Sequence, residues 1–269
     1  MVADILQGFQ RPDAADEAHA LFRFLDAVDG LDFIHACKRQ MRELGPVEAG
    51  HAVLDVGCGL GHEAQRFAAS VGPSGRVVGV DHGEATIAEA RRRAEAPSLA
   101  LELHVGDAHA LDLADDSFDL VRSERVLEYV AEPPRVLAEM MRVARPGGAV
   151  VNFDFDYDSL LVDHPDRRLI RQLKHIFFDS VPHAGVATHL PGLYRAAGLA
   201  DVRVTPITFV TPLAVLERLM SAPLQRAAAA GAIAREALAA WWDHLRAADA
   251  AGRFFATVAG FIVAGRKPG

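Results

Sequence analysis

The spacing of apolar residues changes along the chain, and each spacing predicts a different kind of element. Between residues 14 and 44, apolar side chains recur at helical intervals and predict two short helices separated near Asp29 and Gly30. From residue 52 onward, short apolar runs alternate with segments of helical length, including residues 62–71 and 84–95. The runs predict strands at residues 52–56, 76–80, 99–105, 118–122 and 149–155. This alternation is typical of an α/β fold with a doubly wound, mainly parallel sheet, whose ligands bind beyond the carboxyl ends of the strands.

After residue 156 the alternation becomes less regular. Residues 156–186 form an insertion that is rich in His and Asp. The remaining pattern predicts a helix at residues 187–197, a strand at 202–210, helices within 213–250 that break at Gly231, and a final strand at 253–266. We expect the last two strands to pair antiparallel with each other.

Composition narrows the class of protein. The chain has 269 residues, of which 51% are hydrophobic and 24% charged, so it can bury a sizeable core. A net charge of −8 argues against a protein that binds the phosphate backbone of nucleic acids electrostatically. Two cysteines, Cys37 and Cys58, are too few for a disulfide scaffold. No signal-peptide pattern is found, and the longest apolar run, at residues 254–265, is too short for a membrane-spanning helix. We therefore expect a cytoplasmic protein without nucleic-acid or membrane partners.

A glycine-rich loop, Gly-Cys-Gly-Leu-Gly at residues 57–61, follows the first core strand and opens a helix. Glycines let the backbone turn sharply and let a ligand approach closely, and a helix N-terminus offers free N–H groups. The spacing departs from the dinucleotide-binding pattern, because His62 stands where the third glycine would be. Taken alone, the loop is also explained by a tight turn that binds nothing.

Three acidic residues stand at or near the ends of successive strands. Asp81 ends the second predicted strand, 20 residues after Gly61, where a carboxylate can accept both hydroxyls of a ribose. Asp107 follows the third strand and can reach an adenine amine, while Asp55 could orient the glycine loop by accepting its N–H groups. Each acid is separately explained as a helix cap, but all three together favour a nucleoside-containing ligand.

These segments resemble the motifs of class I S-adenosylmethionine-dependent methyltransferases. Residues 53–61 resemble the first motif, 77–81 the second-strand motif, 106–108 and 116–121 the next two, and 145–148 the turn before the fifth strand. The resemblance implies a Rossmann-like, seven-stranded sheet with an antiparallel last strand, and S-adenosylmethionine as cofactor. It places Asp81 at the ribose, Asp107 and Ala108 at the adenine, and the loop with the Ser123 backbone at the methionine end. The implied cofactor-binding residues are Asp55, Gly57, Cys58, Gly59, Gly61, Asp81, His82, Asp107, Ala108 and Ser123.

His82 departs from the larger apolar residue that often stacks on adenine in this family, although an imidazole can stack as well. A nicotinamide-dependent oxidoreductase is the weaker alternative. Its cofactor carries two phosphates, which the nearby Asp55 carboxylate and the shortened glycine spacing disfavour.

Methyl transfer needs a positioned and desolvated nucleophile more than a fixed catalytic group. We predict that Asp154 or Tyr157 reaches the pocket mouth beyond the fifth strand, and that His164 could act as a base. Loop capping by aspartates and a surface turn at His164 are the alternatives. After the fourth strand, Glu124 could face the pocket, whereas Arg125 and Glu128 could simply pair on a helix. The histidines of the insertion match no short metal-ligand spacing, so no metal site is predicted.

The expected organisation has four parts. Residues 1–45 form a helical cap, 46–155 the S-adenosylmethionine-binding core, 156–186 a lid insertion, and 187–269 the rest of the core sheet with inserted C-terminal helices. Cap and lid would close over an apolar substrate chamber, for which six phenylalanines are candidates: Phe9, Phe22, Phe33, Phe155, Phe177 and Phe178. Adjacent tryptophans on a C-terminal helix would pack in the core or at a homodimer contact.

The sequence therefore predicts a methyltransferase that acts on a small, partly apolar metabolite or a natural-product intermediate, similar to enzymes of quinone biosynthesis. The alternative is an enzyme of the same fold that uses its bound cofactor structurally and catalyses a cyclisation or rearrangement.

Overall fold

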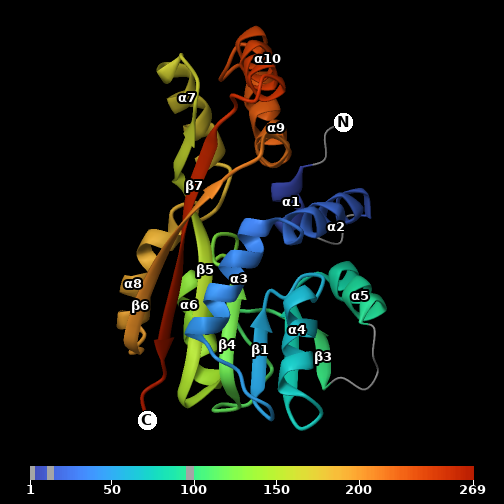
Figure 1. Ribbon diagram of the computed structural model, residues 1–269, viewed down its shortest axis with the longest axis vertical. Helices are drawn as coiled ribbons and strands as arrows, with labels where there is room; N and C mark the ends of the chain where they lie inside the picture. Colours follow the sequence, from blue (N-terminus) through green and yellow to red (C-terminus); the bar gives the residue numbers. More distant parts are fainter. Residues whose placement is uncertain (1–3, 11–14, 95–99) are drawn as a thin grey trace.

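The structure, a computed structural model, describes residues 4–10, 15–94 and 100–269. Its strands are β1 (Ala52–Val56), β2 (Arg76–Asp81), β3 (Leu101–Val105), β4 (Phe118–Glu124), β5 (Ala144–Val162), β6 (Ala200–Val210) and β7 (Ala256–Arg266). Within the described residues they form one seven-stranded sheet in the order β3-β2-β1-β4-β5-β7-β6 (Figure 1). Only β7 runs antiparallel to its neighbours β5 and β6. The predicted fold class and the antiparallel pairing of the last two strands are confirmed.

Helices cover both faces of this sheet. They are α1 (Ile5–Gln10), α2 (Ala15–Asp29), α3 (Asp32–Leu44), α4 (His62–Val71), α5 (Glu84–Arg93), α6 (Pro133–Val143), α7 (Arg167–Phe178), α8 (Val186–Ala196), α9 (Leu213–Ala229) and α10 (Arg235–Ala250). Alternate side chains of the strands face opposite layers. Val53 and Val77 pack with residues of α3, α4 and α5, whereas Leu54 and Val78 pack with α6 and α8. Burial on both faces explains why these strands are continuous apolar runs.

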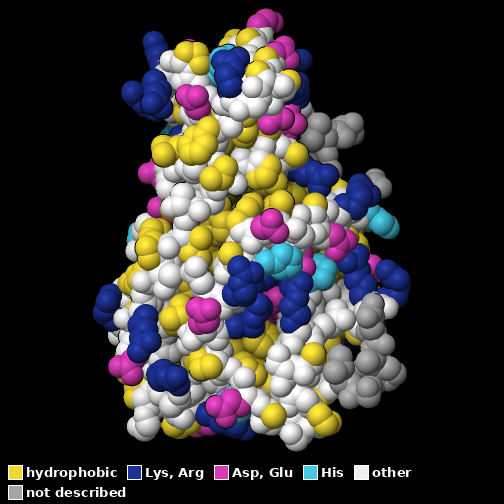
Figure 2. Space-filling view, in the orientation of Figure 1, with side chains coloured by type: hydrophobic (Ala, Val, Ile, Leu, Met, Phe, Trp, Pro, Cys, Tyr) yellow, Lys and Arg dark blue, Asp and Glu magenta, His cyan; other side chains and the backbone are white. Residues whose placement is uncertain are grey.

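The strand β5 is longer than the sequence pattern predicts. It continues past residue 155 to Val162, and its end pairs with β7 through Leu161 and Val162. The first part of the expected insertion is therefore strand. The helix α7 packs against β5, α9 packs against α7 and α10 packs against α9, at the top of Figure 1. Hydrophobic side chains gather toward the same end of the molecule in Figure 2. Val210 at the end of β6 and Phe255 just before β7 are exposed.

The helix after β4 begins later than expected. It starts at Pro133, and Arg125 has a φ of 58° in the left-handed region, which is incompatible with a helix at this point. The expectation that Arg125 and Glu128 pair across a helical turn is therefore wrong. The segment between β4 and α6 instead forms a turn, in which the Arg125 N–H donates to the Phe153 carbonyl.

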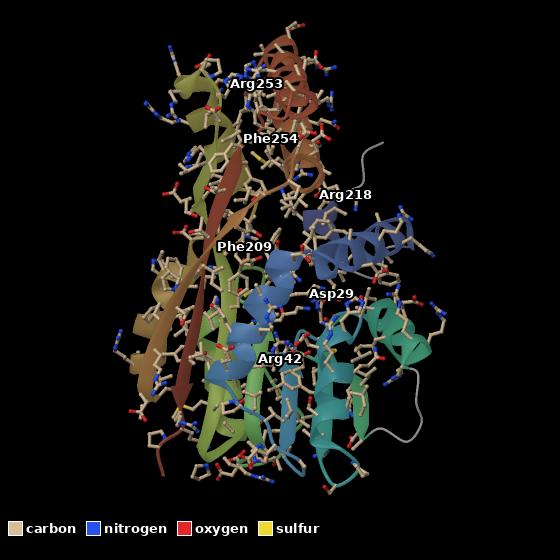
Figure 3. All side chains as sticks on the ribbon, in the orientation of Figure 1. Asp29, Arg42, Phe209, Arg218, Arg253 and Phe254 are labelled. Atoms are coloured by element: carbon tan, nitrogen blue, oxygen red, sulfur yellow. The ribbon has the colours of Figure 1, made fainter. Side chains whose placement is uncertain are left out.

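The helices α1 and α2 lie over the carboxyl end of β1 (Figure 1). Asp29, at the end of α2, lies at the level where this cap meets the strand ends (Figure 3). Within the described residues, no helix has the length and hydropathy that a membrane crossing requires. Trp241 and Trp242 are buried in the core of the chain itself, which favours the packing role over a contact between two copies.

Candidate active site

A cavity of about 470 Å³ lies where the carboxyl ends of the core strands meet the cap. Its volume is within the range of small-molecule sites. Most of the predicted cofactor-binding residues line it: Asp55, Gly57, Cys58, Gly59, Asp81, His82, Asp107 and Ala108. Gly61 instead forms the N-cap of α4. The Ser123 side chain is fully buried, where its hydroxyl accepts a hydrogen bond from the Asn152 amide.

The glycine loop needs its glycines for two separate reasons. Gly57 has a φ of 69°, and a Cβ at this position would lie 2.3 Å from a methyl carbon of Val126. Gly59 has a φ of 53° and opens toward the cavity. Both positions therefore have a backbone conformation that disfavours other residues, and Gly57 in addition packs closely against a neighbouring loop.

Asp81 holds the glycine loop against the end of β2. One of its carboxylate oxygens accepts from the Gly59 N–H at 2.9 Å, and the other accepts from the Gly83 N–H at 3.0 Å. Each carboxylate oxygen has two lone pairs, so Asp81 can accept further hydrogen bonds from a ribose. Thr86 adds a polar group to the same cavity: its buried hydroxyl has no hydrogen-bond partner among the residues described here. These features fit a nucleoside-containing cofactor.

The sequence suggested that Asp55 orients the glycine loop by accepting its N–H groups, but Asp55 has another partner. The register of β1 and β4 places Asp55 beside Arg122, and its Oδ1 lies 2.6 Å from the Arg122 Nη1. The N–H groups of Gly57 and Cys58 instead donate to the Val80 carbonyl. Burial raises the pKa of Asp55 to about 6, although Arg122 opposes this rise.

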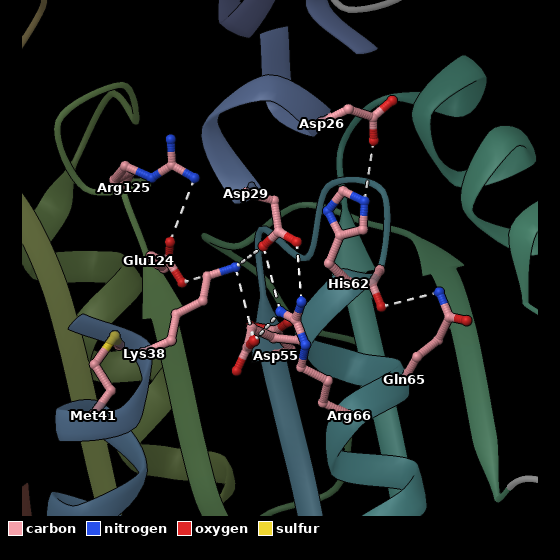
Figure 4. Close-up of polar contacts among 12 residues, drawn as sticks. Asp26, Asp29, Lys38, Met41, Asp55, His62, Gln65, Arg66, Glu124 and Arg125 are labelled. Atoms are coloured by element: carbon pink, nitrogen blue, oxygen red, sulfur yellow. Dashed lines mark hydrogen bonds and ion pairs between the residues drawn. The ribbon is translucent and has the colours of Figure 1, made fainter. Parts of the chain in front are cut away.

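Charged side chains from four elements meet along one wall of this cavity (Figure 4). Lys38 of α3 lies 2.5 Å from Asp29 and 3.8 Å from Glu124 of β4. Arg122 contacts Glu124 at 2.8 Å as well as Asp55. Burial alone would raise the pKa of Glu124, but the cations around it dominate and lower this pKa to about 2. A wall of mixed charge suits a ligand that carries both an ammonium and a carboxylate group.

A smaller, mostly apolar cavity of about 50 Å³ adjoins the first one. Phe9, Arg125 and Tyr129 line both cavities and form the junction between them. Aromatic rings dominate the walls of this aromatic chamber: Phe9, Phe24, Phe33, Tyr129, Phe155, Tyr157 and Phe209. Three of the phenylalanines expected from the sequence, Phe9, Phe33 and Phe155, are therefore part of it. Phe177 packs behind the wall, with its ring centroid 5.2 Å from that of Tyr157.

The three predicted catalytic residues lie in different places. Tyr157 lines the aromatic chamber. Asp154 lines neither cavity, because its buried carboxylate accepts from the Glu128 N–H at 3.3 Å and so supports the turn after β4. His164 also lines neither cavity. Because β5 continues to Val162, His164 lies beyond the far end of the strand, where its ring centroid is 4.5 Å from that of His244.

Glu128 is the functional candidate that the sequence reasoning assigned to a surface pair instead. Its side chain is only 1% exposed and lines the aromatic chamber. Its Oε2 accepts from the Phe155 N–H at 3.1 Å, and its Oε1 accepts from the Tyr157 hydroxyl at 3.0 Å. Burial raises the pKa of Glu128 to about 7. No local sequence signal identifies this residue, because its burial depends on the turn after β4 and the extension of β5.

Comparisons with known proteins identify the family of the chain. Residues 48–179 match a methyltransferase domain family. The chain is 38% identical over 244 residues to an uncharacterized 37.1 kDa protein in transposon TN4556 of Streptomyces fradiae, a match that covers 89% of this chain and 69% of that protein. It is 36% identical over 175 residues to the demethylmenaquinone methyltransferase of Shouchella clausii, which covers 64% and 72% respectively.

Two solved structures share the fold. Phosphoethanolamine N-methyltransferase 2 of Haemonchus contortus, in complex with S-adenosyl-L-methionine, has a TM-score of 0.64 and 18% identity, covering 100% of this chain and 61% of that one. The cyclase SpnF has a TM-score of 0.53 and 22% identity, covering 87% and 80%. The chain belongs to the methyltransferases of this fold. It is an S-adenosylmethionine-dependent enzyme, and S-adenosylmethionine is its cofactor.

Proposed function

We propose that this enzyme methylates a small, partly apolar metabolite that lies in the aromatic chamber, such as a quinone-related or natural-product intermediate. The observation that carries the proposal is the junction at Phe9, Arg125 and Tyr129, three residues that line both the larger cavity and the chamber. The relationship to a demethylmenaquinone methyltransferase supports a substrate of this kind. When bound, S-adenosylmethionine supplies a methyl group activated by its positive sulfur.

The residues of the chain divide the binding work among them in this proposal. Asp81 binds the ribose, Asp107 and Ala108 lie at the adenine, and residues 57–60 contact the methionine portion. The charged wall formed by Lys38, Arg122 and their acidic partners faces the ammonium and carboxylate groups. The aromatic rings of the chamber exclude water, so the acceptor loses its hydration before it meets the methyl group.

The test is calorimetric titration with S-adenosylmethionine and S-adenosylhomocysteine, followed by mass analysis of acceptors incubated with the loaded enzyme. We expect saturable binding that Asp81→Ala weakens at least tenfold. Asp243→Asn on α10, with a side chain 77% exposed, serves as the control that leaves binding unchanged. Failure of both ligands to bind would overturn the proposal. Because Asp81 also holds two backbone N–H groups, the folding of Asp81→Ala is checked by thermal unfolding.

The second candidate function is a cyclisation or rearrangement with the cofactor in a structural role. The observation that favours this alternative is the fold that the chain shares with the cyclase SpnF. Methyl transfer adds the mass of one CH₂ group to the product and releases S-adenosylhomocysteine, whereas cyclisation does neither. The product mass therefore decides between the two.

A further inference from the structure

The junction between the two cavities carries an unusual polar group. The Arg125 Nη2 lies 3.4 Å from Glu124 Oε1, while its buried Nε has no hydrogen-bond partner among the described residues. A buried donor without a partner is costly, at roughly 1–3 kcal/mol. Arg125 also adopts the left-handed backbone conformation, with a φ of 58°. Strained backbone and an unpaired donor at the same residue point to a ligand that supplies the missing acceptor.

Glu128 lies on the same short turn and also lines the chamber. Besides Tyr157, the groups near its carboxyl are Arg125 and Tyr129 on its own segment and Asp154 on β5. From the turn before α8, the His183 backbone N–H donates to the Glu128 carbonyl. The hydroxyl oxygens of Tyr129 and Tyr157 are 3.5 Å apart, so Tyr129 extends this cluster to the junction. A carboxyl with a pKa of about 7 is partly ionised near neutral pH and can accept a proton there.

We propose that the methyl acceptor is an aromatic hydroxyl compound, whose oxygen lies against Arg125 and Tyr129 and whose proton passes to Glu128. This inference rests on the proposed function and names the substrate class of the same site. The O–H bond breaks and its proton binds the Glu128 carboxylate. The oxygen forms a bond to the methyl carbon, and the sulfur–carbon bond breaks with its electron pair left on sulfur as a neutral thioether.

The surroundings favour this class over other nucleophiles. The walls of the chamber are mainly aromatic rings, which suit a planar ring in offset or edge-on contact. A guanidinium at the junction stabilises the developing phenolate and lowers the pKa of the acceptor hydroxyl. The same positive charge opposes the positive charge that develops on a nitrogen nucleophile during methyl transfer, so an amine acceptor is disfavoured. Thr211, whose buried hydroxyl has no partner among the described residues, provides a second polar contact on the chamber wall.

The first experiment measures methyl transfer to 1-naphthol and to 1-naphthylamine from labelled S-adenosylmethionine. We expect the naphthol to be the acceptor, with a kcat/KM that rises with pH and levels off above about pH 7, where Glu128 is ionised. In Glu128→Gln the kcat falls by roughly 10²–10⁴-fold and this rise is lost. The matched control Glu236→Gln, on the exposed side of α10, leaves rate and pH profile unchanged.

The second experiment needs no turnover. The enzyme saturated with S-adenosylhomocysteine is titrated with 4-nitrophenol, whose ionised form absorbs visible light. Wild type is expected to bind this probe as the phenolate at a pH where the free probe is mostly neutral. Arg125→Gln abolishes this shift, and Arg125→Lys partly restores it, which separates loss of charge from loss of folding.

Three outcomes would overturn the inference while the proposed function stands. They are cofactor binding without methylation of the naphthol, equal rates for the naphthol and the naphthylamine, and a Glu128→Gln variant with the wild-type rate and pH profile. Absence of cofactor binding is a different result, because it would overturn the proposed function itself.

Discussion

The carboxylate of Asp55 and the guanidinium of Arg122 lie side by side on β1 and β4, with 2.6 Å between Oδ1 and Nη1. The side chains are only 3% and 4% exposed. Arg122 also contacts Glu124 at 2.8 Å, so one buried cation balances two buried acids directly beside the cofactor cavity. The stability of the core sheet and the charge of the site therefore depend on the same residue.

Removal of the Arg122 charge is expected to destabilise the fold strongly. Arg122→Gln leaves Asp55 and Glu124 without their shared partner, which costs about 3–5 kcal/mol for a buried pair. Urea unfolding followed by circular dichroism measures this loss. Arg76→Gln is the matched control, because Arg76 pairs with Glu102 at 2.8 Å on the exposed edge of the same sheet. An exposed pair contributes about 1 kcal/mol or less. Equal losses in the two variants would therefore contradict the role of Arg122 as the buried partner of Asp55 and Glu124.

Replacement of Gly57 by alanine should damage both folding and cofactor binding. The new Cβ would lie 2.3 Å from a Val126 methyl carbon, in addition to the backbone strain at a φ of 69°. Gly147→Ala meets no atom within 4 Å at a φ of 77°, so it isolates the backbone strain, about 1–2 kcal/mol. We expect Gly57→Ala to lower the free energy of unfolding by more than this. We also expect it to weaken the binding of S-adenosylhomocysteine, which calorimetry measures. The double variant with Val126→Ala recovers part of the loss; no recovery would argue against the clash.

The raised pKa of Glu128 has a consequence for stability. Its pKa is about 7 in the folded protein and about 4.3 in an unfolded chain, so the folded state holds the proton more tightly. Its contribution to stability is complete below about pH 4.3 and is lost as the pH rises through about 7. The stability of wild type should therefore fall relative to Glu128→Gln across this window. Urea unfolding of both proteins at pH 5 and pH 8 tests this, and parallel changes would show that Glu128 does not titrate as described.

Asp107 should matter for binding and not for folding. Its side chain is 65% exposed, and hydrogen bonds from the backbone N–H and the ring of His109 lower its pKa and keep it ionised. Asp107→Ala is expected to weaken S-adenosylmethionine binding about tenfold, the effect of roughly one hydrogen bond to a charged group. Thermal unfolding of the free protein should remain close to wild type. An unchanged Kd would remove Asp107 from the adenine site.

Much of the core could be predicted because its signals are local. The apolar runs of β1, β2 and β4 are short and continuous, since helices bury both faces of these strands. Asp81 follows directly from the position of the second apolar run. It lies near the glycine loop because the carboxyl ends of all parallel strands of such a sheet meet at the same edge. The predicted position of most cofactor-binding residues around one cavity follows from the same rule.

The positions of the catalytic candidates depend on contacts between distant segments, which no local sequence pattern indicates. His164 is a candidate base from the chemistry of imidazole alone, but pairing with β7 extends β5 to Val162, and His164 lies beyond that end of the strand. Glu128 was read as part of a helix, yet the turn at Arg125 directs it under Tyr157.

The sequence by itself determined the order of the seven strands, the glycine turn and the acid at the end of β2. These features arise from hydrophobic periodicity and backbone conformation, which act over a few neighbouring residues. Only the tertiary structure decided that Asp55 pairs with Arg122 and that Glu128 is buried beside Phe155 and Tyr157. Such contacts join segments far apart in the chain, and strand register and packing select them after the local elements have formed.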